Sequence, residues 1–309
     1  MGMFRKKKWI RHQQNPVLDL RPGFFDSNHI HAPMVVKESG IYLMWYSGSD
    51  RKPNEHHVIG HARSSDGISW ERNQDPVLVP SGRTGYYTTP AILRDRGGEV
   101  LREDGKFRMW FTGKPPSPDL YLATSPDGLE WELHSPGPIA HNIYCPSVIF
   151  DEGRYRMWYT LAEVGGPMVI RHATSEDGVT WALDEGSSFR STEPWEHPNV
   201  LYPFVLTRDV YEMYYTSYGH RICEIAMATS EDGVLWKKGD GPILSPDPSS
   251  SWDSIYCSNP SVLVGPGGRD VMYYASRVDM EHKYYAIGLA IRDGDRGDQI
   301  ISSISSTFL

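Results

Sequence analysis

A proline recurs along most of this 309-residue chain at a nearly constant interval. Successive copies are 57, 56, 57 and 57 residues apart, and each is followed by a short apolar or β-branched run; the five are Pro33, Pro90, Pro146, Pro203 and Pro260. A repeat of this length indicates one supersecondary unit per copy, and such units either stack or close into a ring. The period therefore constrains the fold before any single motif is considered.

Each repeat carries the signals of several short strands. A run rich in aromatic residues and methionine follows the proline segment, for example at 43–46 and 156–159, and this enrichment favours strands over helices. A third run leads into a turn of the form Ser-x-Asp-Gly-x-x-Trp, which occurs four times and ends at Trp70, Trp131, Trp181 and Trp236. Asp-Gly closes tight hairpins because glycine takes positive φ freely. Since the tryptophan begins a fourth run, each repeat is predicted to be a four-stranded antiparallel meander.

The two ends of the chain complement each other. The fifth repeat stops after its third run, at 286–290, while Trp9 and Pro16 near the N-terminus reproduce the Trp-to-Pro spacing of the fourth runs. We therefore predict that the N-terminal segment supplies the missing outer strand. The predicted fold class is all-β: a five-bladed β-propeller of four-stranded antiparallel blades, with the ring closed by the N-terminal strand pairing in the last blade.

The repeat fills most of the chain, so we predict a single domain over 1–309. The predicted parts are the outer strand of blade 5 (9–19), blade 1 (24–82), blade 2 (83–138), blade 3 (139–193), blade 4 (194–250), the inner strands of blade 5 (251–292) and a tail (293–309).

Charge and composition limit the classes of partner. The net charge of −8 argues against nucleic acid or an anionic membrane surface as the main partner. We see neither a signal-peptide pattern nor an apolar run long enough to span a membrane. Three cysteines do not suggest a disulfide framework, so the expected location is the cytoplasm.

The proline-anchored run, the Met-Trp-Tyr run and the Ala-Thr-Ser-x-Asp-Gly-x-x-Trp turn together resemble the five-bladed propeller glycosidases of glycoside hydrolase families 43, 32, 68, 117 and 130. The resemblance covers nearly the whole chain and implies the propeller fold. The usual catalytic acids of families 43 and 32 are not matched. Where those families place an acid in blades 1, 2 and 3, this chain has Ala32, Thr89 and Tyr144.

Three other carboxylates are candidates for catalysis. Asp26, Glu196 and Asp253 each lie seven residues before an anchor proline, in the first, fourth and fifth repeats. Glycoside hydrolysis uses two carboxyl groups, one as acid and one as base or nucleophile, and acids from different blades could converge at the mouth of a central funnel. The alternative is a structural one: a repeated offset can mark a repeated task, such as bonding backbone N–H groups at a turn.

Histidines gather at the same predicted rim. His29 and His31 precede the first inner strand, His141 the third and His197 the fourth. In family 117, which the chain resembles, a histidine is thought to act as general acid. The two-carboxylate hypothesis requires no cofactor, but several funnel histidines could hold a divalent cation. They could equally form an ordinary polar lining, because no His-x-x-x-His or Cys-x-x-Cys spacing is present.

Aromatic and amide side chains complete a predicted saccharide site. Tyrosine rings stack on sugar C–H faces, amides read hydroxyl groups, and arginine binds carboxylate, sulfate or phosphate. The predicted substrate-binding residues are His29, His31, Tyr87, His141, Tyr144, His197, Tyr202, Asn259 and Arg277.

These observations support one leading functional hypothesis and two alternatives. The leading one is an exo-acting glycoside hydrolase that cleaves a glycosidic bond of a small oligosaccharide or glycoside in the central funnel. The first alternative is a carbohydrate-binding propeller without turnover, motivated by the missing acids. The second is a phosphate-dependent glycoside phosphorylase, as in family 130.

Overall fold

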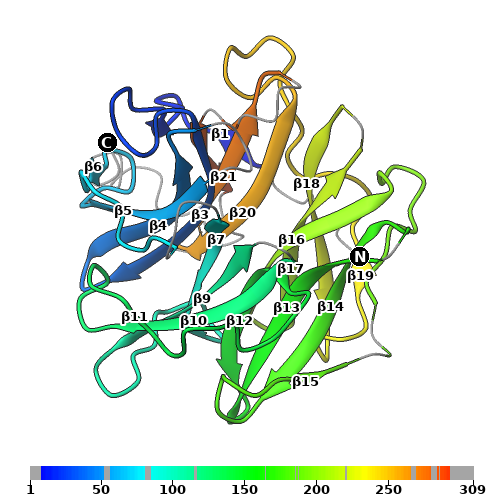
Figure 1. Cartoon of the computed structure of the whole chain (residues 1–309). Coiled ribbons are helices and arrows are strands. Elements are labelled where there is room, and N and C mark those ends of the chain that lie inside the picture. The colour runs from blue at the N-terminus through cyan, green and yellow to red at the C-terminus, as the bar shows by residue number, and fades with distance from the viewer. Residues whose placement is uncertain are drawn as a thin grey trace.

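The computed structural model of the chain describes residues 8–51, 56–80, 85–114, 117–163, 165–184, 186, 188–219, 221–265, 269–279, 284 and 286–292. This part of the chain is all-β and contains no helix, hence no helix long and apolar enough to cross a membrane. Figure 1 shows the sheets distributed around the middle of the molecule.

The strands fall into groups that follow the sequence repeat. The first two groups are β3 (His29–Glu38), β4 (Ile41–Ser49), β5 (His56–Ser64) and β6 (Glu71–Arg72), then β7 (Gly85–Ile92), β9 (Phe107–Lys114), β10 (Asp119–Ser125) and β11 (Glu132–Leu133). The next two are β12 (Tyr144–Asp151), β13 (Arg154–Ala162), β14 (Met168–Ser175) and β15 (Ala182–Leu183), then β16 (Asn199–Thr207), β17 (Tyr211–Tyr218), β18 (Cys223–Ser230) and β19 (Lys237–Lys238). In each group the strands pair in chain order as an antiparallel meander.

The last group combines both ends of the described chain. It contains β20 (Tyr256–Val264), β21 (Asp270–Arg277) and β22 (Ala286–Arg292), and β22 also pairs with β1 (Ile10–Arg11) and β2 (Leu18–Asp19). The register places Ile10 opposite Ile291. A short strand β8 (Arg94–Asp95) follows β7 and pairs in parallel with β12. The N-terminal segment thus covers the edge of β22 that would otherwise be exposed.

The first strand of each group lies nearest the middle of the molecule (Figure 1). Contacts run from β3 to β7, β12, β16 and β20 and then back to β3. Each of these strands is irregular at its proline, where the pairing register shifts. The residue before each proline has positive φ of 50–55°, at Ala32, Thr89, Cys145, Tyr202 and Asn259. A bulge of this kind bends the strand and redirects the side chains before it.

A repeated hydroxyl contact holds these bulges in place. The backbone N–H before the proline donates to a Ser or Thr hydroxyl on the second strand of the preceding group: Thr89 to Ser47 at 3.0 Å, Cys145 to Thr112 at 3.0 Å, Tyr202 to Thr160 at 3.1 Å and Asn259 to Thr216 at 3.3 Å. The matching position on β21 is Ala275, which has no hydroxyl. These contacts satisfy buried N–H groups that the bulges remove from strand pairing.

The Asp-Gly turns connect neighbouring meanders. The indole N–H of Trp45 donates to the Gly128 carbonyl at 2.9 Å, and Trp110 and Trp158 repeat the contact one group further along the chain, with Gly178 at 2.8 Å and Gly233 at 2.7 Å. The hydroxyl of Tyr273 in the last group donates to Gly67 of the first at 2.8 Å. The repeated turn therefore has a structural function, as its recurrence indicated.

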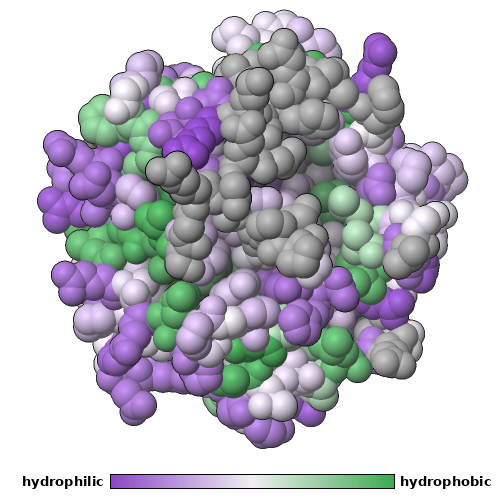
Figure 2. Space-filling view, viewed as in Figure 1, coloured by the Kyte–Doolittle hydropathy of each residue, from purple (hydrophilic) through white to green (hydrophobic). Residues whose placement is uncertain are grey.

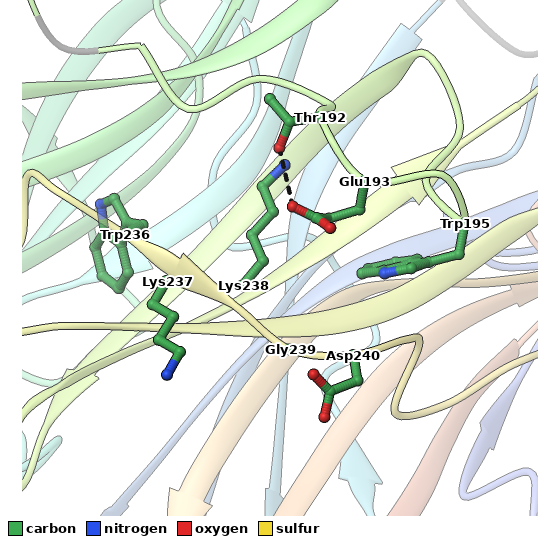
Figure 3. A pocket seen from close by; sticks show the side chains of 8 residues that line it. All are labelled: Thr192, Glu193, Trp195, Trp236, Lys237, Lys238, Gly239 and Asp240. Carbon is green, nitrogen blue, oxygen red and sulfur yellow. Dashed lines mark hydrogen bonds between the residues drawn. The ribbon is translucent and has the colours of Figure 1, made fainter.

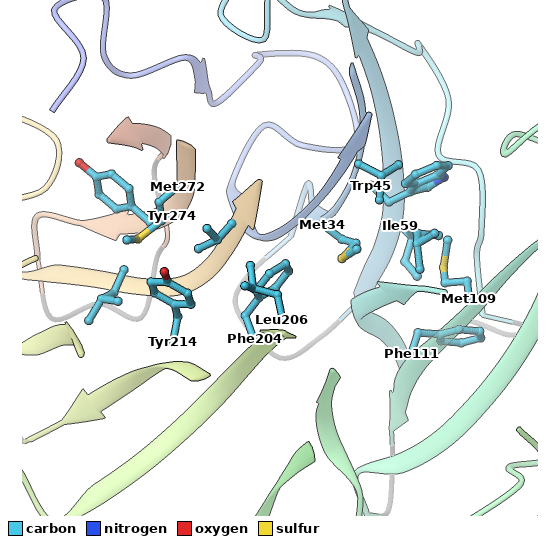
Figure 4. Packing of buried hydrophobic residues seen from close by; sticks show 14 of the residues in the cluster. Met34, Trp45, Ile59, Met109, Phe111, Phe204, Leu206, Tyr214, Met272 and Tyr274 are labelled. Atoms are coloured by element: carbon cyan, nitrogen blue, oxygen red, sulfur yellow. The ribbon is translucent and has the colours of Figure 1, made fainter. Parts of the chain in front are cut away.

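The hydrophobic core lies between the faces of adjacent meanders. Figure 4 shows Trp45 and Ile59 from the first group beside Met109 and Phe111 from the second. On the surface, hydrophilic residues are interspersed with smaller apolar areas across the face seen in Figure 2.

Candidate functional site

A cavity of about 290 Å³, here called the histidine cavity, lies where several central strands begin. Its described lining consists of His29, His31, His57, Tyr86, Thr88, Tyr144, Met168, Leu201, Tyr202, Tyr218, Cys223, Tyr256, Arg277 and Tyr284. Among these side chains there is no carboxylate. The cavity therefore combines imidazoles, phenols and the guanidinium of Arg277. No acid in the described lining offsets the positive charge of Arg277.

Three histidines converge in this cavity. His29 and His31 lie two residues apart on β3, so they share a face of the strand, and His57 comes from β5. Their candidate ligand nitrogens all lie within 4.8 Å of one another, and all three side chains are buried. Burial lowers the pKa of His29 and His31 well below the usual value and that of His57 to about 4, with neighbouring imidazoles adding to each shift. The cluster is therefore neutral at pH 7, as cation binding requires.

The hydrogen bonds of His31 and His29 indicate which imidazole nitrogens have a lone pair free to bind a cation. Nε2 of His31 lies 3.1 Å from the Thr88 hydroxyl, and its buried Nδ1 has no hydrogen-bond partner among the described residues. The hydroxyl can accept from Nε2–H, which leaves the Nδ1 lone pair free for a metal ion. The N–H of Tyr284 donates to Nδ1 of His29 at 3.2 Å, so in the neutral ring Nε2 carries the proton. His29 must give up that bond in order to bind a cation, either through Nδ1 directly or through Nε2 after its proton has moved to Nδ1.

The three histidines fit a divalent cation that prefers nitrogen ligands. Imidazole suits Zn²⁺, Cu²⁺, Fe²⁺ and Ni²⁺, and three histidines with an open position form a known type of catalytic zinc site. Zn–N bonds are about 2.0–2.1 Å long, so nitrogens up to 4.8 Å apart must move slightly together on binding.

Tyrosines and Arg277 form much of the remaining cavity lining. The hydroxyls of Tyr144 and Tyr202 lie 3.2 Å apart, and burial raises the pKa of both phenols well above the usual value, so both remain protonated donors. Arg277 is 3% exposed and its guanidinium lies 4.4 Å from the ring centre of Tyr256. Its Nε donates to the Asp279 carbonyl at 3.2 Å, whereas its buried Nη2 has no hydrogen-bond partner among the residues that the structure describes. That nitrogen is available to an anionic or hydroxyl-bearing ligand.

The three candidate carboxylates lie outside the described lining of this cavity. Asp26 is fully buried; it accepts from the Tyr46 hydroxyl at 2.8 Å and forms ion pairs with Arg72 at 3.0 Å and Arg21 at 3.2 Å. Asp253 is fully buried as well, and it accepts from Tyr274 at 3.0 Å and pairs with Arg11 at 2.6 Å.

Glu196 repeats the same arrangement. It accepts from the Tyr215 hydroxyl at 2.7 Å and pairs with Lys238 at 2.5 Å. It also accepts the backbone N–H groups of Thr192 at 2.8 Å and Glu193 at 3.0 Å, which is the turn-bonding role weighed as the alternative for these acids. Although burial opposes ionisation, the bond from Lys238 and these N–H groups lowers the pKa of the carboxyl below its usual value. A carboxylate held this way is a poor proton donor at neutral pH.

The sequence contained a signal for this structural role. The cation that pairs with each acid comes two residues after the tryptophan that begins the outer strand: Arg72 after Trp70, Lys238 after Trp236 and Arg11 after Trp9. In the second and third repeats that position is Leu133 or Leu183, and neither repeat has an acid seven residues before its proline. Acid and cation therefore occur together or not at all.

The other predicted residues divide between the cavity and its surroundings. His29, His31, Tyr144, Tyr202 and Arg277 line the cavity together. Outside it, Tyr87 is buried against Phe111 and Tyr121, with ring centres 4.7 and 5.5 Å away; His141 is largely exposed with Nδ1 3.1 Å from Asp119; His197 lies 3.5 Å from Glu224; and Asn259 lines a separate channel described below.

The list of predicted substrate-binding residues lacks several lining residues, notably His57, Thr88 and Tyr284. His57 begins a third strand rather than preceding a proline, and Tyr284 lies on a connection without a repeated motif. Only the pairing of β5 with β7, which places His57 opposite Tyr86, brings His57 to the cavity.

A larger surface pocket of about 510 Å³ lies at the outer part of the fourth group (Figure 3). Its side chains include Trp195, Trp236, Lys237 and Asp240, and Lys238 lies among them. Lys238 is bound to Glu196, and none of the described residues that line this pocket is a histidine or a buried acid. The histidine cavity is therefore the better candidate for chemistry.

Comparisons with known proteins agree with the fold. No family model matches the chain. The uncharacterized protein Rv1502 of Mycobacterium tuberculosis is 28% identical over 288 residues, covering 81% of this chain and 90% of that protein. The A type blood N-acetyl-alpha-D-galactosamine deacetylase of Flavonifractor plautii is 27% identical over 328 residues, covering 84% of this chain and 42% of the deacetylase.

Solved structures with similar folds are described as carbohydrate-active enzymes. A glycosyl hydrolase from Bacteroides ovatus superposes with a TM-score of 0.75 at 17% identity, covering 95% of this chain and 96% of its own. A structure from work on mannoside phosphorylases and glycoside hydrolases of the GH130 family gives 0.74 at 17%, covering 95% and 96%. The N-acetylgalactosamine deacetylase of F. plautii, in complex with blood group B trisaccharide, gives 0.68 at 16%, covering 89% and 95%. The chain therefore has a glycoside-hydrolase-like fold.

Proposed function

We propose that this protein is a carbohydrate-active hydrolase that binds a saccharide in the histidine cavity. It removes an acyl group from that saccharide with the help of a divalent cation. Within this proposal the strand groups are the blades of a five-bladed β-propeller, and β1 and β2 close the ring by pairing with β22. The observation that carries it is the convergence of three buried, neutral histidines in a cavity whose described lining has no carboxylate.

The reaction balances with water alone. The oxygen of water bonds to the amide carbon of an N-acetylated sugar, the C–N bond breaks, and a water proton ends on the released amine. A bound divalent cation supplies Lewis acidity and lowers the pKa of the attacking water. His29, His31 and His57 would hold the cation, and the phenols and the Arg277 guanidinium of the lining would donate hydrogen bonds to the sugar hydroxyls. The name of the F. plautii relative supports an N-acetyl sugar as the substrate class.

This proposal replaces the exo-acting glycosidase as the first choice. Two-carboxylate hydrolysis needs a pair of acids that face the scissile bond. Asp26, Glu196 and Asp253 instead each bind a tyrosine and a cation within their own blade, and none lines the described cavity. We assign them a structural role in linking the outer strand of a blade to the entry of its inner strand.

The test measures two products, acetate and new reducing ends, that the protein could release from the same saccharides. Purified protein, stripped with a chelator and reloaded with Zn²⁺ or Mn²⁺, is incubated with N-acetylated mono- and oligosaccharides, and free acetate and new reducing ends are measured separately. Metal-dependent acetate release that is lost in His57→Gln supports the proposal. Reducing ends without acetate favour glycoside hydrolysis, and saturable binding without either product indicates a binding protein.

A second candidate is phosphorolysis, which is favoured by the Nη2 of Arg277, a buried donor without a hydrogen-bond partner among the described residues. Inorganic phosphate at this nitrogen would attack the anomeric carbon, the glycosidic C–O bond would break, and the leaving oxygen would take the phosphate's proton. The products would be a sugar 1-phosphate and an alcohol. Sugar phosphate that forms only when phosphate is added, and that disappears in Arg277→Met, would identify this reaction.

A further inference from the structure

A narrow channel lies next to the histidine cavity, at the centre of the molecule. This channel, of about 40 Å³, passes between the five anchor prolines, and Tyr202 lines both spaces. Fifteen residues line the channel, all within the described part of the chain, and none is an Asp or Glu. Most of its wall is proline, alanine, methionine and phenylalanine, so a charge placed here has few polar partners.

One lining residue is nevertheless a fully buried arginine. Arg94, at the start of β8, is 1% exposed, and its guanidinium lies 4.1 Å from the ring centre of Phe204. Nη2 donates to the Ser147 hydroxyl at 3.3 Å, whereas Nε and Nη1 have no hydrogen-bond partner within the described part of the chain. The neighbouring Asp95 accepts the backbone N–H of Glu99 at 2.9 Å in a turn that is largely exposed.

Among the described residues no acid forms a hydrogen bond with the Arg94 guanidinium, and the electrostatic effect of Asp95 offsets only part of the cost of burying its charge. Burial lowers the pKa of Arg94 to about 9, and the group is therefore still charged at neutral pH. A buried ion without a counter-charge costs several kcal/mol, and each unmade hydrogen bond adds to that cost. A ligand that supplies negative charge and accepts hydrogen bonds would remove both penalties.

We propose that the axial channel binds a small inorganic anion, of halide size, between Arg94 and Ser147. Nε and Nη1 of Arg94 are the charged donors. The Ser147 hydroxyl already accepts from Arg94 and from the Val205 N–H at 3.0 Å, so its own proton is free to point at the anion. The volume holds about one to three water-sized groups, which is enough for chloride or bromide with a water. The anion neutralises the centre of the ring, where the central strands meet.

Crystals soaked in sodium bromide test the site directly. An anomalous peak within hydrogen-bond distance of the Arg94 guanidinium is the expected result, and a channel holding only water would overturn the proposal. In solution, thermal unfolding is followed in sodium chloride and in sodium gluconate at equal ionic strength. The melting temperature should rise with chloride and not with gluconate, because a ligand that binds only the folded state stabilises it.

Two variants distinguish chloride binding at Arg94 from a general effect of salt on stability. Arg94→Met should abolish the difference between chloride and gluconate. Arg96→Met is the matched control, since Arg96 lies two residues away, is half-exposed and is 3.8 Å from Asp151; it should keep the difference. Equal chloride dependence in the wild type and Arg94→Met would refute the site. If Arg94→Met fails to fold, the bromide soak of the wild type still decides.

Discussion

The hydroxyl of Thr88 on β7 lies 3.1 Å from Nε2 of His31 on β3 and 2.9 Å from the hydroxyl of Ser47 on β4. Ser47 in turn accepts the N–H of Thr89 at 3.0 Å, the residue with positive φ before Pro90. One chain of hydrogen bonds thus connects the bulge of the second central strand to the orientation of an imidazole on the first. The histidine cavity is oriented by the same contacts that join neighbouring strand groups.

Replacing Thr88 should weaken cation binding without removing a ligand. Thr88→Val keeps the shape of the side chain but deletes the acceptor for His31 Nε2–H, and loss of such a partner typically lowers metal affinity about 10–100-fold. Titration calorimetry with Zn²⁺ measures the change. Thr88→Ser, which retains the hydroxyl, should bind close to the wild-type affinity. Equal affinities for the Val and Ser variants would exclude this orienting role.

Asp26→Asn should reduce stability rather than chemistry. It leaves Arg72 and Arg21 without their buried counter-charge, and breaking a buried ion pair costs about 3–5 kcal/mol. Denaturant unfolding should show this loss, while the folded fraction binds Zn²⁺ normally. Asp19→Asn is the control, because Asp19 is 71% exposed in its pair with Arg72 and should change stability by less than about 1 kcal/mol. A selective loss of turnover in folded Asp26→Asn would restore the catalytic hypothesis for this acid.

The hydroxyl contacts between groups predict a specific cost. Thr112→Val removes the acceptor for the Cys145 N–H and for the Thr89 hydroxyl, and a buried donor left unpaired costs about 1–3 kcal/mol. Chemical denaturation of Thr112→Val should show a decrease in this range. Thr124→Val, at a half-buried position on the third strand of the same group, should have little effect. A similar decrease for both variants would mean that the contact is not the cause.

The histidine cluster predicts how stability varies with pH. His57 has a pKa of about 4 in the folded protein and about 6.5 in an unfolded chain, so between these values only the unfolded state takes up the proton. The free energy of unfolding of the metal-free protein should therefore fall as pH decreases from about 6.5 to 4. His57→Gln should reduce that slope by up to about 1.4 kcal/mol per pH unit, the value for one proton. Parallel slopes for both proteins would contradict the burial of a neutral His57.

Removing the N-terminal strands tests their contribution to the last sheet. Deletion of residues 1–19 exposes the edge of β22 and leaves Asp253 without Arg11, so we expect a lower melting temperature and aggregation during heating. Circular dichroism during a thermal ramp measures the melting temperature, and light scattering measures aggregation. Ile10→Lys, at a position 67% exposed, should leave the strand pairing intact. A deletion variant as stable as the full chain would show that β1 and β2 are dispensable.

The amino-acid sequence by itself determined the period, the order of strands within each repeat, the hairpin turns and the match between Trp9 and the unfinished last repeat. These follow from local rules, because strand periodicity and Asp-Gly turns depend on neighbours in the chain. The same pattern also paired each of Asp26, Glu196 and Asp253 with a cation two residues after a tryptophan, although that spacing became meaningful only once the outer strand was seen beside the inner one.

Only the tertiary structure decided where the chemistry could lie. The cavity draws its side chains from strands far apart in the sequence, so His57 meets His29 and His31 only because β5 runs alongside β7 at the centre. Residue types alone could not show a second distinction: the acids lie in ion pairs, the buried histidines are neutral, and Nε and Nη1 of Arg94 have no hydrogen-bond partner among the described residues. Desolvation and pairing depend on what surrounds a group in three dimensions, and that environment is absent from the linear chain.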